Sequence, residues 1–587
     1  MKLIFAVLCA SAVAFMIRVL AALLGEMRTP SPRQVAFHLS KYIPHKKHGD
    51  LIVMNSKTRN RKFPDQAKRA AFTIAALMLL MPAARGQQAA SQPPTASAQE
   101  VKELRDLVKQ LQAKVDKLES EQQKNTDKLA LPEKDAATSA SNPQVPQVAD
   151  AAFSGASPTS TAPAKKEKAD PFSFADFTWL NGNARTKTPA FDSKFFTPEI
   201  RADVDYIYDL NNPKDDTISG SSEVFRSKEI QLTQLGVGGD FHYDNVQARL
   251  MTQFGMYSQT TPRNDASPAR GQWNLDNAYR YISEAYGGYH FNALDGVNVQ
   301  AGIFMSYVGL FSYYNFDNWA YQPSYVSSNT PWFFEGLRVQ IFPNEHLKIE
   351  PWLINGWQSY GRFNNRLGVG GQILWRPNGW FSFVGNQYAL GADALGVPGR
   401  IRYHTDDSIQ VKYYDNPGTF ISKAAFSLTG DLGCEHGGGV SCAGDSSKGP
   451  KQSFVGFMAY NRLWLHKDMF GFTVGGGEIN NPGRYLVLLP PINGATAASG
   501  TPYFTENPGD PYKAWDISGT FDYMPSQYVT FRWEYNHRAA NVPYFSGSGG
   551  VTPPGGNTGD PAVKVPGWTP DLVKDENRFN IALLVKF

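Results

Sequence analysis

Two cysteines lie close together in the Gly-rich stretch GCEHGGGVSCAG, at positions 434 and 442. The flexible chain between them allows the two thiols to meet, and a disulfide can form where the chain lies outside the cytoplasm. A metal site built from Cys434, Cys442 and His436 is the alternative, but a tetrahedral site needs a fourth ligand that this stretch does not supply. We therefore predict a Cys434–Cys442 disulfide that staples a long loop, and no metal site.

A nucleophilic hydrolase needs a serine held by a histidine. The segment YNHR supplies Asn536 and His537 near the end of an alternating segment, but the nearby Ser546 and Ser548 fall in a loop that the sequence does not place. The chain has 10 His residues and shows no nucleophile motif, phosphate loop, zinc spacing or nucleotide fingerprint. An outer-membrane hydrolase is the enzymatic alternative, but we expect no catalytic activity and no cofactor.

The remaining chemistry lies in charged residues that alternate with apolar ones. In IRADVDYIYDL, Arg201, Asp203 and Asp205 fall on one side of the segment and the bulky apolar residues on the other. Rings of charge set ion selectivity where such a face lines a pore, whereas elsewhere these residues are ordinary members of a salt-bridged wall. Because the signs are mixed, we expect a weak ion preference. The candidates for lining a lumen are Arg201, Asp203, Asp205, Arg249, Arg338, Lys348, Glu350, Lys412, Asp516, Asp522, Arg532, Glu534 and Arg578.

The segments that carry these charges are predicted strands joined as hairpins with unequal ends. Apolar residues make up 42% of the chain and charged residues 19%, and 52 residues are Gly, which favours an all-β protein. Tight connections alternate with long ones, and an up-and-down sheet then carries every short turn at one end, as outer-membrane barrels do. The tight connections are 243–245, 294–296, 343–346, 377–379, 466–468 and 524–526, and the long ones are 259–277, 311–331, 432–452, 481–512 and 538–576.

Two all-β folds fit this alternation, a soluble barrel or sandwich with an apolar interior and a membrane barrel with an apolar exterior. The soluble fold needs one core for more than about 400 residues, and single domains rarely grow that large. We therefore predict a transmembrane antiparallel up-and-down β-barrel over residues 171–587, with about 16 strands and a range of about 14 to 18. A barrel of this size encloses water unless loops enter it. Among the long loops, the aromatic Phe311–Pro331 is the best candidate to fold inward as a constriction, and the alternative is that its Tyr residues belong to the outer aromatic girdle.

The last eleven residues, NRFNIALLVKF, also alternate. Phe579 and Phe587 share an apolar face, and Arg578 lies on the opposite, mostly polar face. A terminal strand that ends in Phe resembles the signal by which the barrel assembly machinery recognises outer-membrane proteins. We expect Phe579 and Phe587 to serve assembly, with outer-membrane lipid around the barrel.

The N-terminal part of the chain has the features of a targeting sequence. Residues 1–86 carry a net charge of +11 and the remainder −7, so the basic excess is local and gives no support to nucleic-acid binding. The apolar stretch Ala70–Met81 follows several basic residues and precedes Ala84 and Gly86, which is typical of a secretory signal. We interpret 54–86 as the signal peptide and 1–53 as an over-extended gene start, with an inner-membrane anchor in 1–53 as the alternative.

A heptad pattern follows the expected cleavage site. Apolar residues three and four apart predict a short α-helical coiled coil within residues 87–124, in the periplasm, and the Ala/Ser/Pro/Thr-rich residues 125–170 predict a flexible linker. A helix isolated by linkers must bury its apolar stripe against copies of itself, so we expect a homo-oligomer. The heptad positions are Val101, Leu104, Val108, Leu111, Val115 and Leu118.

The run Gly302–Gln340, above all NTPWFFEG at 329–336, resembles the outer-membrane β-barrel porin family described as OmpL-like, and RYHTDDSIQVKYY at 402–414 is a weaker match. The resemblance covers roughly 177–587. It implies an outer-membrane porin of a Gram-negative bacterium that lets small hydrophilic solutes diffuse through a water-filled barrel. The heptads are similar to those of trimeric sugar and phosphate porins, which implies a trimer by analogy. The alternative function is a non-conducting barrel that acts as an adhesin or scaffold through its long loops.

Overall fold

The computed structural model describes residues 171–391, 397–444 and 447–587. The gene-start extension, signal peptide, coiled coil and linker that the sequence predicts lie within residues 1–170, outside the described residues. Among the described residues, no helix is both long enough and apolar enough to cross a membrane.

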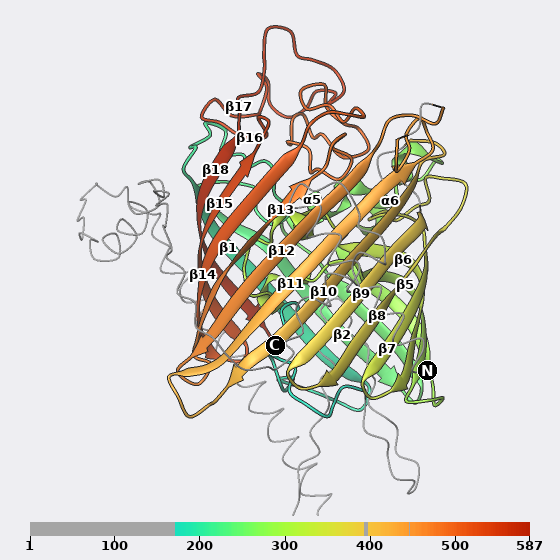
Figure 1. The fold of residues 1–587 in the computed structure, drawn as a ribbon, viewed down its shortest axis with the longest axis vertical. Helices are drawn as coiled ribbons and strands as arrows, with labels where there is room; N and C mark the ends of the chain where they lie inside the picture. Colours follow the sequence, from blue (N-terminus) through green and yellow to red (C-terminus); the bar gives the residue numbers. More distant parts are fainter. Residues whose placement is uncertain (1–170, 392–396, 445–446) are drawn as a thin grey trace, which may run out of the picture. The chain divides into compact units, whose positions relative to one another are not determined.

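Sixteen antiparallel strands form one closed barrel, in which each strand pairs with its sequence neighbours and β1 pairs with β18 (Figure 1). The predicted fold class and the central strand count are therefore confirmed. The strands are β1 Phe196–Asp209, β2 Ile230–Tyr243, β3 Val246–Thr252, β4 Ile282–Phe291, β5 Val297–Met305, β6 Phe333–Asn344, β7 Leu347–Ile354, β8 Gly368–Asn378, β9 Phe381–Gly391, β10 Ile401–Asp415, β11 Ile421–His436, β12 Ser453–Leu465, β13 Phe470–Asn480, β14 Lys513–Ser526, β15 Val529–Ala540 and β18 Asp575–Lys586.

The alternation of residue types decides which face of each strand points outward. On β14, Trp515, Ile517 and Phe521 are exposed on the outside of the barrel, while Asp516 and Asp522 are buried inside it. An apolar exterior around a polar interior is the arrangement that a barrel adopts in lipid, because the outward side chains meet hydrocarbon. The strands thus place the charged residues of the sequence in the barrel interior.

The last strand closes the barrel as predicted. The amide of Phe587 donates to the carbonyl oxygen of Ile200 at 3.0 Å, and the amide of Ile200 donates back at 2.6 Å. Phe579 and Phe587 are exposed on the outer face, whereas Arg578 is buried on the inner face. Closure pairs both outer edges of the sheet and leaves no strand edge open to lipid.

Short turns gather at one end of the barrel, where the C-terminus lies, and long loops at the other (Figure 1). The sequence missed the short turn 416–420 and the long loops 210–229 and 355–367. It was wrong about 432–436, which continues β11 instead of starting a loop. The loops contain α5 Tyr257–Thr260, η2 Thr261–Asn264, η3 Ser267–Ala269, α6 Leu275–Tyr279, η4 Asn315–Asp317, α7 Tyr325–Ser328 and the small hairpin of β16 Phe545–Ser546 with β17 Leu572–Val573.

Residues 171–192, here named the mouth segment, do not form a strand, although the sequence placed them in the barrel domain. The amide of Phe172 donates to Glu345 in the β6–β7 turn at 2.9 Å, and Arg185 donates to Ser526 at the β14–β15 turn at 2.6 Å. These two turns lie on nearly opposite sides of the ring of strands. The mouth segment therefore crosses the short-turn end of the barrel, and the first strand begins only at Phe196.

The connection between β5 and β6, residues 306–332, is here named the inner loop. Every residue of it is buried, and its side chains contact inward-facing residues from strands around the barrel. Four of its aromatic side chains, among them Phe311 and Trp319, pack with those of the strands and the mouth segment in the main hydrophobic cluster, and the others belong to two smaller clusters. The prediction that Phe311–Pro331 folds into the barrel is confirmed.

Candidate functional site in the barrel interior

The inner loop is held against β1 by hydrogen bonds to three of the predicted lumen residues. The Tyr321 hydroxyl lies 3.0 Å from an Asp203 oxygen and 2.9 Å from an Asp205 oxygen. Arg201 contacts the Asp317 carboxylate at 3.0 Å. Because these groups alternate on one strand, β1 presents them in a row to the loop.

Strands β15 and β14, which follow β18 beside β1 in the ring, hold the same loop through backbone contacts. The Glu534 carboxylate accepts the amides of Tyr321 at 2.7 Å and Gln322 at 2.9 Å. Asp516 accepts the amide of Tyr325 at 2.9 Å, and Arg532 donates to the carbonyl oxygen of Asn315 at 3.1 Å. The loop lacks a regular ladder, so these wall charges satisfy backbone groups that would otherwise be buried without partners.

Six other predicted lumen residues form ion pairs with partners on the wall strands. Lys348 contacts Glu350 at 2.7 Å, and Arg338 lies 3.8 Å from the same carboxylate. Asp522 bridges Arg532 at 2.7 Å and Arg462 at 2.8 Å. The remaining pairs are Arg249 with Asp240, Glu199 and Glu284, and Arg578 with Glu576.

Lys412 is the remaining predicted lumen residue, and it lies near the short-turn end of the barrel. Its ammonium group pairs with Asp415 and lies 5.8 Å from the centre of the Trp179 ring in the mouth segment. In the same segment, burial alone would raise the pKa of Asp176, but hydrogen bonds from Lys187 and Thr178 lower that pKa to about 2. Charges at this end thus fix the mouth segment in place.

All thirteen predicted lumen residues therefore lie on inward faces, but they do not line open water in this structure. All except Lys412 are buried. They are covered by the inner loop, by the mouth segment and by one another. The sequence pattern gives the face of each residue but not what covers it, because the covering segments have no period of their own.

The sequence missed two further groups in the interior. On β10 and β11, Arg402 pairs with Glu435 at 2.9 Å, and the His404 ring lies 2.6 Å from Asp431. Arg402 and His404 alternate in RYHTDDSIQVKYY, so period-two reading of that run could have found them. The aromatic anchors Trp179 and Trp319 were also missed, and only the density of aromatic residues in their segments pointed to them.

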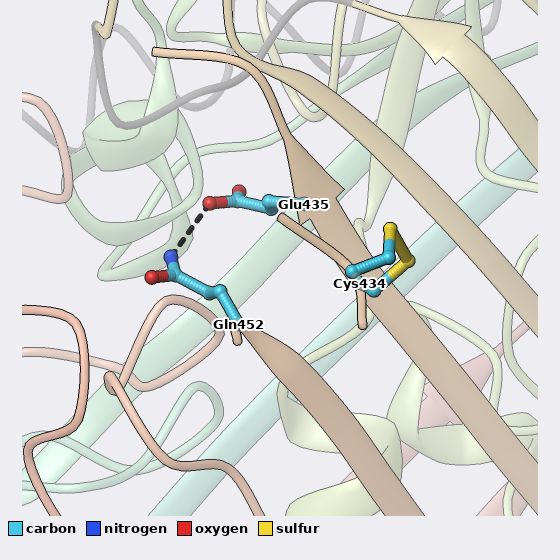
Figure 2. Close-up of a disulfide and its surroundings, with 4 residues drawn as sticks. Cys434, Glu435 and Gln452 are labelled. Atoms are coloured by element: carbon cyan, nitrogen blue, oxygen red, sulfur yellow. Dashed lines mark hydrogen bonds between the residues drawn. A yellow bond between two sulfur atoms is a disulfide. The ribbon is translucent and has the colours of Figure 1, made fainter. Parts of the chain in front are cut away.

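Cys434 and Cys442 are joined by a disulfide with an S–S distance of 2.04 Å. Cys434 stands on β11, so the bond ties a strand end to its loop instead of joining two loop residues as predicted. Figure 2 shows Glu435 beside it, with its carboxylate accepting a hydrogen bond from Gln452 at 2.8 Å. No group of three potential ligands suited to a metal ion occurs among the described residues.

The hydrolase alternative depends on His537 and a nearby serine, which the structure does not bring together. His537 contacts Asn577 at 2.9 Å and packs against the outward Trp515 ring. Ser546 is buried and shares a hydrogen bond of 2.6 Å with Ser219. These partners differ from those of a catalytic triad, in which the serine hydroxyl contacts the imidazole.

Glu223, in the loop between β1 and β2, meets the inner loop at the long-loop end. Its carboxylate accepts hydrogen bonds from Ser222 and from Gln322 of the inner loop. Burial raises the pKa of Glu223 to about 7, although these bonds and the charge of Arg538 act in the opposite direction. A carboxyl that titrates near neutral pH therefore touches the loop that fills the barrel.

Residues 201–560 match the family model described as "Putative beta-barrel porin-2, OmpL-like". No curated protein sequence matches the chain.

Solved outer-membrane barrels align with much of the chain at low identity. OmpT of Vibrio cholerae is 9% identical, with 68% of this chain and 99% of that chain covered and a TM-score of 0.38. The channel DcaP of Acinetobacter baumannii is 13% identical, covering 68% and 100% with a TM-score of 0.38. An anion-selective porin from Comamonas acidovorans is 11% identical, covering 67% and 99% with a TM-score of 0.38.

Proposed function

Because this chain belongs to the OmpL-like "Putative beta-barrel porin-2" family of outer-membrane barrels, we propose that it lets small hydrophilic solutes diffuse passively through the barrel interior. The observation that carries this proposal is the polar interior of a closed sixteen-strand barrel. Sixteen strands enclose enough space for an aqueous path once loops leave room for it. The thirteen inward charges named above then form the polar wall along which solutes move.

Passage requires the mouth segment or the inner loop to move. Trp179 of the mouth segment is 1% exposed and Tyr321 of the inner loop is 0% exposed. Both segments are held by hydrogen bonds and aromatic contacts instead of by strand pairing, which makes them easier to displace than the wall. In this proposal the strands of the barrel stay in place, and movements of the mouth segment and the inner loop determine how often the path opens and how wide it is.

The same filled interior favours a second function, a non-conducting barrel that binds partners through its long loops. The two functions differ in one measurement, the current that the refolded protein carries across a planar bilayer. Discrete current steps support the pore. A folded barrel that carries no current, with or without the mouth segment, supports the adhesin or scaffold.

The expected partners follow from the same proposal. Outer-membrane lipid meets the apolar exterior, and the barrel assembly machinery inserts the chain by its last strand. A homo-oligomer, a trimer by analogy, depends on the predicted coiled coil at 87–124. Replacing Leu104 and Leu111 by polar residues reduces crosslinked oligomers if the coiled coil drives association, and leaves them unchanged if the barrel walls do.

A further inference from the structure

Two adjoining recesses lie at the long-loop end, against the inner loop. The first is lined by Arg263, Thr261 and Gln358 among others, and the second by Arg402 and Trp357 among others. Both are lined by Asn264, Ser328 and Leu488, so that they form one continuous narrow recess.

Arginine supplies all the formal charge on the described lining of this recess. Arg402 is matched by Glu435, whose carboxylate lies 2.9 Å from its guanidinium group. Arg263 is half-buried and makes no hydrogen bond or ion pair with another described residue. The nearby Glu223 directs its carboxylate to Ser222 and Gln322 instead. The recess therefore holds one cationic group that no carboxylate contacts, although the charge of the nearby Glu223 acts on it from a distance.

An unpaired guanidinium group attracts anions more strongly in a narrow recess than in open water, because less solvent screens its charge. Its planar fork of N–H groups fits a carboxylate in a two-point contact. Hydroxyl and amide groups of Thr261, Ser328 and Gln358 line the same space and can donate further hydrogen bonds. Among the wall charges, the Asp203 and Asp205 carboxylates and the Glu534 carboxylate are met by neutral donors of the inner loop, and Arg263 lies apart from them at the long-loop end.

We propose that this recess is an anion-binding site at the long-loop end of the barrel, in which Arg263 takes a small inorganic anion. The site shifts the selectivity of the pore toward anions, beyond the weak preference that the mixed signs of the wall predict. This inference deepens the proposed function and rests on it for its role in transport.

The first test measures the reversal potential of the refolded full chain in a potassium chloride gradient. We expect the chloride-to-potassium permeability ratio to fall about two- to five-fold in Arg263→Gln, which is the effect of one partly exposed charge. Arg270→Gln is the matched control, because Arg270 lies on the same loop but is exposed and donates to Phe363 instead of lining the recess. A preference that Arg263→Gln leaves unchanged, or that Arg270→Gln lowers equally, overturns the proposal.

A second measurement does not depend on conduction. In detergent-refolded protein, the chloride NMR signal should be broadened by exchange with the bound anion, and Arg263→Gln should narrow it more than Arg270→Gln does. Equal linewidths for both variants overturn the anion site. If the protein carries no current but shows this difference, the site stands and the proposed transport function fails.

Discussion

The indole Nε1 of Trp319 donates a hydrogen bond to the carbonyl oxygen of Trp179, 3.1 Å away. The amide of Trp319 also donates to the Asn181 side chain at 2.8 Å. Trp319 belongs to the inner loop and Trp179 to the mouth segment, which lie 140 residues apart in the chain. The two segments that fill the barrel are thus fastened to each other as well as to the wall.

Replacing Trp319 by Phe should loosen the mouth segment. The substitution keeps an aromatic ring but leaves the buried Trp179 carbonyl oxygen without its donor, which costs about 1–3 kcal/mol. We expect the fraction of time that single channels are open to rise about five-fold or more. Trp515→Phe is the control, since Trp515 points outward and touches neither segment. Equal open fractions in the two variants would show that the contact does not restrain conduction.

Replacing Tyr321 by Phe should free the inner loop from β1. The Tyr321 hydroxyl is the group that meets Asp203 and Asp205, and its loss leaves these buried carboxyl groups with fewer partners, at about 1–3 kcal/mol. We expect a larger conductance per open channel, because the loop can move from the wall. Tyr206→Phe, on the outer face of the same strand, should conduct as the wild type does. If both variants keep the wild-type conductance, the Tyr321 hydroxyl does not restrain the inner loop.

The raised pKa of Glu223 predicts that the packing of the β1–β2 loop against the inner loop depends on pH. Because burial raises the pKa of Glu223 from 4.5 to about 7, the folded protein binds more protons than the unfolded chain between these values. The stability of this contact therefore falls as pH rises from about 4.5 to about 7, and is level above that range. Amide hydrogen exchange at Ser221–Val224, corrected for its intrinsic pH dependence, should be more protected at the acidic end of this range.

Glu223→Gln, which is neutral at every pH, should remove this dependence and keep the protection at its acidic level. Glu229→Gln is the matched control, because Glu229 lies in the same loop but is only half-buried and pairs with Arg226. If the pH dependence survives in Glu223→Gln and disappears in Glu229→Gln, the titrating group is Glu229 and the assignment to Glu223 is wrong.

Deleting Phe587 should lower the amount of folded barrel and leave the conductance of each assembled channel unchanged. Phe587 points outward, and its backbone pairs with Ile200 to close the ring. Outer-membrane abundance and single-channel conductance are the two measurements. Truncation that changes conductance but not abundance would contradict the outward placement of Phe587.

The strands could be predicted from the sequence because each carries its own period. Asp516 and Asp522 alternate with Trp515 and Phe521, so the face of each residue follows from its position alone. Arg578 shows where this reasoning ends. The alternation makes it a candidate for lining the lumen, with a salt-bridged wall residue as the alternative, and the structure buries it beside Glu576 at 3.2 Å. Pairing between residues depends on register and on covering segments, which a single strand pattern does not contain.

The length and aromatic content of the inner loop set it apart in the sequence, but they do not predict which residues the loop contacts. Tyr321 reaches Asp203 only because β1 and β5 belong to one closed ring, a relationship that appears once the barrel is complete. The mouth segment was missed for a similar reason. Its apolar residues, such as Phe172 and Trp179, have no strand period and become buried only when the barrel mouth exists to receive them.

The current that single molecules carry across a planar bilayer tests the central claim most directly. The comparison uses the refolded full chain and a variant that lacks residues 171–188, with heat-dependent gel mobility to show that both barrels are folded. We predict discrete, voltage-proportional steps for the full chain and larger or longer steps for the variant, because the segment across the mouth is gone. Folded barrels of both kinds that carry no current would contradict the claim that this protein is a pore.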